Sequence, residues 1–235
     1  MNYLSLVCAR GGSKGLPGKN AKILSGKPLI GHAVSCAKSL TRVQSVFIST
    51  DSEELAELAK SEGAQVPFLR PEKLSQDGSS EWDVWRHMIH YWNTQQIEYH
   101  GLLVVPPTAP LRSKADVEAC LDLFETGKFD IVVTVTDAAR SPYFNMVKES
   151  EGGCVELVIQ PESKMVRRQD VPEVFDMTTV AYVANPDYVL SASGLFEGRV
   201  GYVHVPPERA IDIDTQLDFD IAQYLAQERF KNEMS

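Results

Sequence analysis

The sequence predicts a three-layer α/β protein, in which a mostly parallel sheet carries helices on both faces. Two observations support this class. Short apolar runs alternate with helical patterns from residue 3 to residue 135, and the run at 102–105 is continuously apolar. Strands that alternate with helices form parallel sheets through right-handed crossovers, and strands covered on both faces are apolar throughout. Ligands of such sheets bind where the strands end, so the loops that follow the strands are the first candidates for a site.

The chain has 235 residues and a formal net charge of −9, and we expect one domain from residue 1 to residue 235. The acidic balance argues against nucleic acid as a partner. No apolar run approaches the ~20 residues that span a membrane. Four widely spaced cysteines indicate free thiols in a reducing compartment: Cys8, Cys36, Cys120 and Cys154. We therefore expect a cytoplasmic protein with no membrane partner.

The expected elements follow one another regularly along most of the chain. Strands are predicted at residues 3–9, 45–50, 64–69, 102–105, 130–135, 178–184 and 200–205. Helices are predicted after Pro28, which suits a first helical position, and at residues 52–62, 80–94, 113–126 and 214–230. Gly63 and Gly127 are stop signals, and Ser113 is a cap.

Two of these helices carry apolar residues at helical spacing. The first holds Trp82, Trp85, Ile89 and Trp92, which we interpret as core or interface packing. His87 and His90 lie one turn apart on the same helix, and without further ligands they indicate a packing or surface role. In the last helix we expect three residues to face the core: Leu217, Ile221 and Leu225.

The alternation breaks between about residues 138 and 178. Ser141-Pro142, Gly152-Gly153 and Pro161 punctuate short strands without helices between them. This pattern predicts an antiparallel flap inserted in the domain.

The loop at residues 8–20 is rich in glycine and in basic residues. Glycine lets the backbone turn tightly and approach a ligand, and backbone N–H groups with fixed cations form a phosphate cradle. The cations are Arg10, Lys14 and Lys19, and residues 1–50 contain seven basic residues but no Asp or Glu. Neither the Walker pattern nor the dinucleotide fingerprint is present. The loop is therefore a candidate anion site, and the alternative is a glycine-rich surface turn.

Asp212 and Asp214 stand two residues apart in an Ile-Asp-Ile-Asp stretch. If the stretch is extended, both carboxylates point to one face. Two carboxylates on one face suit Mg²⁺, which prefers oxygen ligands. The alternative is that Asp214 caps the helix that follows.

Five blocks of the sequence, in order, resemble the signature of the acylneuraminate cytidylyltransferases (CMP-sialic acid synthetases). The blocks are residues 9–20, Ser49-Thr50-Asp51, Leu69-Arg70-Pro71, residues 107–112 and residues 211–215. The resemblance implies a fold like that of the nucleotide-diphospho-sugar transferases. It also implies a homodimer in which an arm at about 138–178 crosses into the partner's site. The implied reaction is transfer of the cytidylyl group from CTP to a sialic-type nine-carbon keto-sugar acid.

The resemblance assigns roles to individual residues. Catalytic roles fall on Arg10, Lys14, Lys19, Asp212 and Asp214, the last two of which would hold Mg²⁺. Nucleotide binding falls on Ala9, Arg10, Gly12, Ser13, Lys19, Asn20, Arg70, Ser79 and Ser80, and sugar binding on Thr108, Arg112, Phe144 and Arg168. Two of the assigned positions have alternative roles, and the role of Asp51 is also open. Arg70 is otherwise a polar loop residue and Arg168 a solvated charge, and Asp51 contacts ribose or metal or caps a helix.

The chain departs from the family pattern on the sugar side. Pro106 replaces a glutamine, Phe144 replaces a lysine, and Thr178-Thr179 replaces Asn-Gly. Proline offers no side-chain hydrogen bond. The resemblance implies an acceptor of the sialic type, and the departures leave legionaminic, pseudaminic or keto-deoxy-octulosonic acid as alternatives. A hexose 1-phosphate acceptor and a non-catalytic nucleotide-sugar binder are further alternatives.

Overall fold

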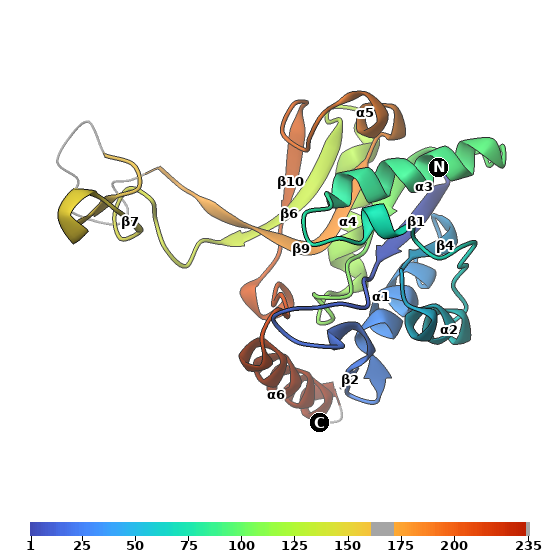
Figure 1. Cartoon of the computed structure of the whole chain (residues 1–235), viewed down its shortest axis with the longest axis horizontal. Coiled ribbons are helices and arrows are strands. Elements are labelled where there is room, and N and C mark those ends of the chain that lie inside the picture. Colours follow the sequence, from blue (N-terminus) through green and yellow to red (C-terminus); the bar gives the residue numbers. More distant parts are fainter. Residues whose placement is uncertain (161–171, 234–235) are drawn as a thin grey trace.

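The computed structural model describes residues 1–160 and 172–233, with side chains up to residue 228. Its centre is a six-stranded sheet of order β10-β6-β9-β5-β1-β4 (Figure 1). The strands are β1 (Tyr3–Cys8), β4 (Val43–Ser49), β5 (Gly101–Val104), β6 (Ile131–Asp137), β9 (Phe175–Ala184) and β10 (Val200–His204). All except β9 run parallel to one another, which confirms the predicted mostly parallel sheet.

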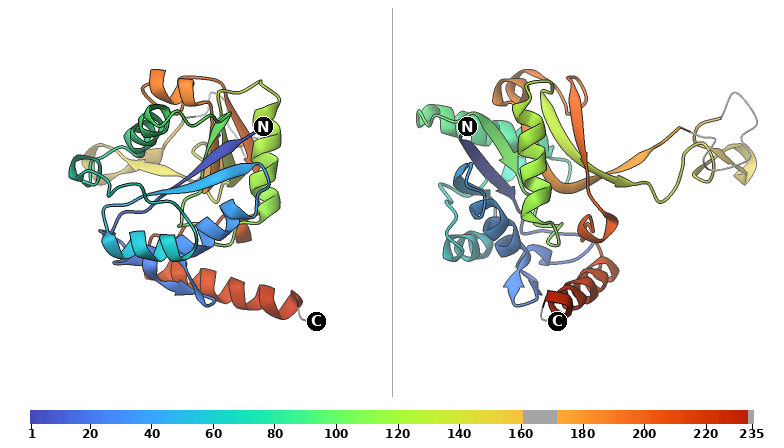
Figure 2. Two further views of the ribbon diagram at one scale, coloured as in Figure 1. Left: turned by 90° about the vertical axis from the view of Figure 1, so that its right-hand side faces the viewer. Right: turned by 180° about the vertical axis from the view of Figure 1, so that it is seen from behind.

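Side chains of β1 alternate between the two faces of the sheet. Tyr3 and Val7 pack toward α1 (Leu29–Lys38), α2 (Glu53–Ser61) and α4 (Lys114–Glu125). Leu4 and Leu6 pack toward α3 (Glu81–Thr94) and α5 (Pro186–Ser191) on the other face. Figure 2 shows these helix layers on either side of the sheet. The three-layer arrangement follows from this alternation, because both faces of the strand are apolar.

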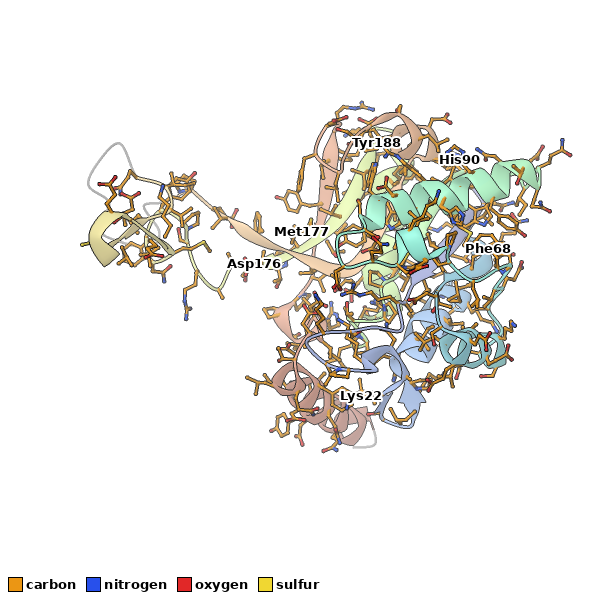
Figure 3. The ribbon with its side chains drawn as sticks, in the orientation of Figure 1. Lys22, Phe68, His90, Asp176, Met177 and Tyr188 are labelled. Carbon is orange, nitrogen blue, oxygen red and sulfur yellow. The ribbon has the colours of Figure 1, made fainter. Side chains whose placement is uncertain are left out.

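The tryptophans of α3 lie in the core, as predicted. Trp82, Trp85 and Trp92 are buried with Met88 and Ile89. The Trp82 indole N–H also donates to the carbonyl of Ala192, so its polar atom is satisfied. His87 packs its ring against Phe68, and His90 is exposed on the outer side of the helix (Figure 3).

Strand β9 is the antiparallel member of the mostly parallel sheet and runs opposite to both of its neighbours. The chain leaves the body after β6, forms the arm, and returns alongside β6. The described residues between these two strands contain no α-helix. A register shift interrupts the β6–β9 ladder between Val132 and Thr134, where the hydroxyls of Thr134 and Thr178 are 2.7 Å apart. The Thr134 hydroxyl also accepts the N–H of Ala181 at 3.4 Å and lies 3.2 Å from the carbonyl of Thr178, so it satisfies backbone groups where the ladder is interrupted.

The strand expected at residues 64–69 is wrong. Gln65 makes a single parallel bridge to Phe47, with two backbone hydrogen bonds of 2.8 and 2.9 Å. Pro67 follows two residues later and has no N–H to donate, so the ladder cannot continue. This edge of the sheet therefore ends at β4.

Helix α6 (Gln216–Glu233) packs beside β2 (Ile23–Leu24), and its buried face differs from the prediction. Phe219, Ala222 and Ala226 are buried, whereas Leu217 and Ile221 are 67% and 41% exposed. Leu225 packs at the margin of the buried cluster. Lys22, labelled in Figure 3, lies 5.5 Å from the centre of the Phe219 ring. Among the helices of the described chain, none is both long and apolar enough to cross a membrane.

The predicted antiparallel flap is present as an arm that projects far from the body (Figures 1 and 2). Beyond Asp176 and Met177 of β9, labelled in Figure 3, it carries β7 (Val147–Glu149) paired antiparallel with β8 (Val155–Leu157). The connection contains Gly152 and Gly153, whose φ values of 74° and 75° suit glycine. Arg168 lies outside the described residues.

Candidate active site

A cleft of about 520 Å³ opens at the carboxyl ends of β1 and β5. Residues of the 8–20 loop, of 70–84, of 106–108 and of 214–215 line it, together with Thr179 of β9. Its size suits a small-molecule ligand. Four loops follow predicted strands, at residues 10–20, 50–52, 70–81 and 106–112, and the first, third and fourth of them line the cleft. The second contributes Asp51, whose carboxylate accepts the Gly11 N–H at 2.8 Å and so supports the glycine loop from behind.

The glycine loop is held in one conformation by its own residues. Asn20 is buried and donates its side-chain amide to the carbonyl of Arg10 at 3.0 Å. The other amide atom, Oδ1, is buried without a hydrogen-bond partner among the described residues. Gly18 adopts φ 65° just before Lys19, and Gly15 approaches so closely that an added Cβ would lie 2.4 Å from the carbonyl oxygen of Asp214. Residues 9–20 and 212–214 therefore meet at one wall of the cleft. Gly12 leaves open space around its Cα.

Each of the three loop cations is paired with a carboxylate. Arg10 and Lys14 both bind Asp77, at 3.1 and 2.5 Å. Lys19 binds Asp214 at 2.7 Å and the carbonyl of Ile213 at 3.0 Å. The Lys14 ammonium, together with Arg10, lowers the pKa of the Asp77 carboxyl. The cations are thus already gathered at the cleft, and a polyanionic ligand can replace these exposed carboxylates as their partner.

The Asp212 and Asp214 pair flanks Ile213, which is fully buried and donates its N–H to the carbonyl of Thr108. Asp214 lines the cleft, and Asp212 Oδ1 is buried with no hydrogen-bond partner in the described chain. An unpartnered carboxylate oxygen beside a second carboxylate fits the ligand preference of Mg²⁺. Residues 1–160 and 172–233 contain no group of three or more His, Cys, Asp or Glu that could hold a metal. The pair would then rely on phosphate and water for its other ligands.

Two predicted capping roles are wrong. Helix α6 begins with reciprocal bonds between Thr215 and Asp218, so Asp214 keeps its carboxylate for Lys19. Helix α2 begins at Ser52, whose hydroxyl accepts the N–H of Leu55, so Asp51 is free to bind Gly11. Both results remove the helix-cap alternative for a carboxylate near the cleft.

Arg70 is buried and is fixed by hydrogen bonds to Ser49, unlike a solvent-exposed polar loop residue. Its Nε donates to the Ser49 hydroxyl at 3.0 Å and its Nη2 to the Ser49 carbonyl at 2.5 Å. It lines the cleft together with Ser79. Ser80 instead caps α3 by accepting the N–H of Trp82 at 3.1 Å, and its side chain does not line the cleft.

Of the described residues predicted to bind the sugar, Thr108 lines the cleft, whereas Arg112 and Phe144 do not. Thr108 lines the cleft and donates its hydroxyl to Thr179 at 3.1 Å. Arg112 is buried beneath the cleft, where it bonds to the carbonyls of Val180, Pro106 and Thr179, and burial lowers its pKa to about 10. Phe144 is exposed on the arm, away from the cleft of its own chain. Both Pro106 and Thr179, which depart from the family pattern, do line the cleft.

Several residues that line the cleft were not predicted as site residues, among them Asp77 and Glu81. Glu81 is the first residue of α3, lines the cleft, and accepts the indole N–H of Trp85 at 3.2 Å. Its position one residue past Ser79-Ser80 was a usable signal, since the first turn of a helix that follows a binding loop faces the same ligand.

A glycine loop with cations after β1, facing acidic residues at the ends of a mostly parallel sheet, is the arrangement expected of a nucleotidyltransferase. The cytidylyltransferase family profile matches residues 4–102. The chain is 31% identical to post-translational flagellin modification protein B of Campylobacter coli, with 96% of this chain and 95% of that protein aligned. The chain belongs to the acylneuraminate cytidylyltransferase family.

The names of other relatives refer to different sugars. A CMP-N,N'-diacetyllegionaminic acid synthase of Campylobacter jejuni is 30% identical, with 94% of each chain covered. An N-acylneuraminate cytidylyltransferase of Streptococcus agalactiae is 28% identical over 93% of this chain and 52% of that protein. The solved structure of CMP:2-keto-3-deoxy-manno-octonic acid synthetase complexed with CTP has a TM-score of 0.72 at 16% identity, covering 97% of this chain and 100% of that chain. This neighbour bears out the expected fold.

Proposed function

We propose that the protein transfers the cytidylyl group of CTP to a sialic-type nine-carbon keto-sugar acid, releasing pyrophosphate. The observation that supports this most directly is the meeting of Arg10, Lys14 and Lys19 with Asp214 in one cleft. In this reaction the anomeric hydroxyl of the sugar attacks the α-phosphorus in line with the leaving pyrophosphate. Fixed cations stabilise the charge that develops on the phosphoryl oxygens.

In this proposal, different residues of the cleft bind the triphosphate, the base and the sugar. Arg10 and Lys14 exchange Asp77 for the triphosphate, and Lys19 remains close to Asp214 through the Ile213 carbonyl. The buried, anchored Arg70 and the backbone at Ser79 contact the cytosine. Mg²⁺ bound by Asp212 and Asp214 would polarise the phosphoryl oxygens. Thr108 and Thr179 face the acceptor, and Arg112 supports their backbone from below.

The proposed identity of the sugar depends on Pro106, one of the two departures from the family pattern that line the cleft. Pro106 presents apolar surface where the family has a glutamine. An apolar wall rejects an added hydroxyl only weakly, whereas a hydrogen-bonding site strongly rejects a sugar that lacks the bonded group. A deoxy or methyl-ended acid, such as legionaminic or pseudaminic acid, therefore fits this wall. N-acetylneuraminic acid is the alternative if other groups read the sugar, and keto-deoxy-octulosonic acid is a further one.

The experiment is a pyrophosphate-release assay with CTP and a panel of these acids. We expect release with at least one nonulosonic acid, and a loss of at least several kcal/mol of transition-state stabilisation in Asp212→Asn, on the scale of metal-ion catalysis. CTP should still bind to the variant. A preference of about tenfold in kcat/KM for N-acetylneuraminic acid, about 1.4 kcal/mol, would end the deoxy-sugar assignment. Absence of release with every acid would contradict the proposed reaction.

We also propose that the enzyme is a homodimer whose arms cross between subunits. The arm exposes apolar side chains that its own chain leaves uncovered: Phe144, Met146, Val147, Val155, Val158 and Ile159. Exposed apolar residues in such number on a projecting segment are typical of a surface that is buried in an assembly. In such a dimer Phe144 would reach the sugar of the partner subunit's cleft.

A further inference from the structure

Three carboxylates line the cleft, and their partners differ. Asp77 pairs with Arg10 and Lys14, and Asp214 pairs with Lys19. The third, Glu81, has no cation within ion-pair distance in the described part of the chain. It therefore differs from the other two, which a polyanion can displace from their cations. A carboxylate left without a cation in a basic cleft has a different role.

Glu81 is held in place from two sides. Its backbone begins α3, where the Ser80 hydroxyl caps the first turn. Its Oε1 accepts the indole N–H of Trp85, which is itself buried between Trp82 and Tyr182. A carboxylate can accept about four hydrogen bonds, so one bond from Trp85 leaves capacity for a ligand. The side chain is thus pre-oriented toward the cleft with free acceptor sites.

Glu81 is an exposed residue whose carboxylate lies among other polar and charged groups of the cleft. Protein surrounds the carboxylate although it stays accessible from the cleft, and this burial raises its pKa. The Trp85 N–H, the charge of Arg70 and the thiol of Cys8 oppose the increase, and the charge of Asp212 adds to it.

A carboxylate only accepts hydrogen bonds, so its ligand must donate. The triphosphate and the carboxylate of the sugar acid are anionic acceptors, which Glu81 would repel. The exocyclic amino group of cytosine is a donor, and Glu and Asp side chains are its usual partners in base recognition. Uracil carries an acceptor oxygen at the same position. Resting on the proposed function, we infer that Glu81 selects CTP over UTP by accepting an N–H from the exocyclic amine of the base.

The rest of the cleft fits this role. Arg70 lines the same cleft and uses Nε and Nη2 for Ser49, so its remaining nitrogen is available to the acceptor atoms of the base. Arg70 and Glu81 then form a donor and acceptor pair that matches cytosine and mismatches uracil at the exocyclic position. Glu81 also follows directly after the Ser79-Ser80 backbone assigned to the base.

The test measures binding of CTP and UTP by calorimetry, without any sugar acid, in the wild type and in Glu81→Gln. Glutamine keeps an acceptor for the Trp85 N–H, and its amide can donate to uracil. The CTP-to-UTP affinity ratio should therefore fall by about tenfold or more, the discrimination expected of one base contact. The matched control is Asp83→Asn, because Asp83 lies on the same helix, is exposed and pairs with Arg86. This variant should keep the wild-type ratio.

Two outcomes would overturn the inference: a wild type that binds CTP and UTP equally, or a Glu81→Gln variant with an unchanged affinity ratio. A failure of the proposed function can be distinguished from a failure of this inference. A protein that prefers CTP through Glu81, yet releases no pyrophosphate with any acid, would contradict the reaction while supporting the role of Glu81.

Discussion

Asp116 serves a helix and a tertiary contact with one side chain. It forms a reciprocal capping box with Ser113 at the start of α4. Its two oxygens also accept Nε and Nη2 of Arg209, both at 2.9 Å, and the side chain is only 6% exposed. Arg209 precedes the Asp212–Asp214 stretch by a few residues. The pair therefore ties the proposed metal-binding segment to α4.

Asp116→Asn should destabilise the protein at pH 7 more than at low pH. Burial alone would raise the Asp116 pKa, but the hydrogen bonds from Arg209 and Ser113 outweigh it and hold the pKa below the usual 3.8. Because the folded-state pKa is lowered, the stabilisation is present above the unfolded-state value and is lost as pH falls through the folded-state value. We expect a loss of about 1–3 kcal/mol at pH 7, measured by urea unfolding.

The difference between Asp116→Asn and the wild type should narrow as the pH falls below about 4. Asp122→Asn is a suitable control, since Asp122 is exposed and pairs with Arg42, and such surface pairs contribute at most about 1 kcal/mol. A stability difference that is the same at every pH would show that the charge of Asp116 is not what stabilises the segment.

At the residue scale, the sequence could predict the cations that bind an anion in the cleft. It could not predict the contacts that hold the cleft residues in place. Arg10, Lys14 and Lys19 were recognisable, because cations and glycines are close in sequence and need no tertiary contact to be seen. The bond from Gly11 to Asp51 spans 40 residues, and the unpaired state of Glu81 depends on which cations reach the other carboxylates. These features exist only once the loops meet in space.

At the scale of elements, the strands and helices were predictable wherever one periodicity dominated. The β5 run is apolar throughout, β1 is apolar except for Ser5, and α3 has one tryptophan-rich face. The direction of β9 was not predictable, because a strand pattern contains no sign of direction when the preceding connection lacks a helix. In α6 apolar residues occur on two sides, so spacing alone could not decide which side is buried.

The assignment of the buried face of α6 can be tested with two substitutions on the same helix. Phe219 is buried beside Lys22 and the β2 hairpin, so Phe219→Ala should cost about 3–5 kcal/mol of unfolding free energy. Leu217→Ala removes an exposed side chain, and the change should stay within about 0.5 kcal/mol. Chemical denaturation of both variants measures this. A larger loss for Leu217→Ala than for Phe219→Ala would mean that the other face is buried in solution.

At the scale of the whole molecule, the body and the arm have different chemistry. The body buries its apolar residues in two large clusters on the faces of the sheet. The arm consists of a two-stranded ribbon whose apolar side chains remain exposed. An isolated two-stranded ribbon is marginally stable in water, so its persistence in a folded enzyme calls for another surface to cover it. A second copy of the chain, reached by the arm, would provide that surface.

The dimer proposal is tested by sedimentation velocity on matched surface variants. Val155 on β8 is 67% exposed, and Val155→Asp would place a charge in the proposed interface. Phe196, near α5 and outside the arm, is 74% exposed, so Phe196→Asp makes a comparable apolar-to-acidic change elsewhere. We expect a dimer for the wild type and for Phe196→Asp, and dissociation for Val155→Asp, because burying an unpaired carboxylate costs several kcal/mol. A wild type that sediments as an active monomer would refute the crossing arm, and a Val155→Asp dimer would place the interface elsewhere.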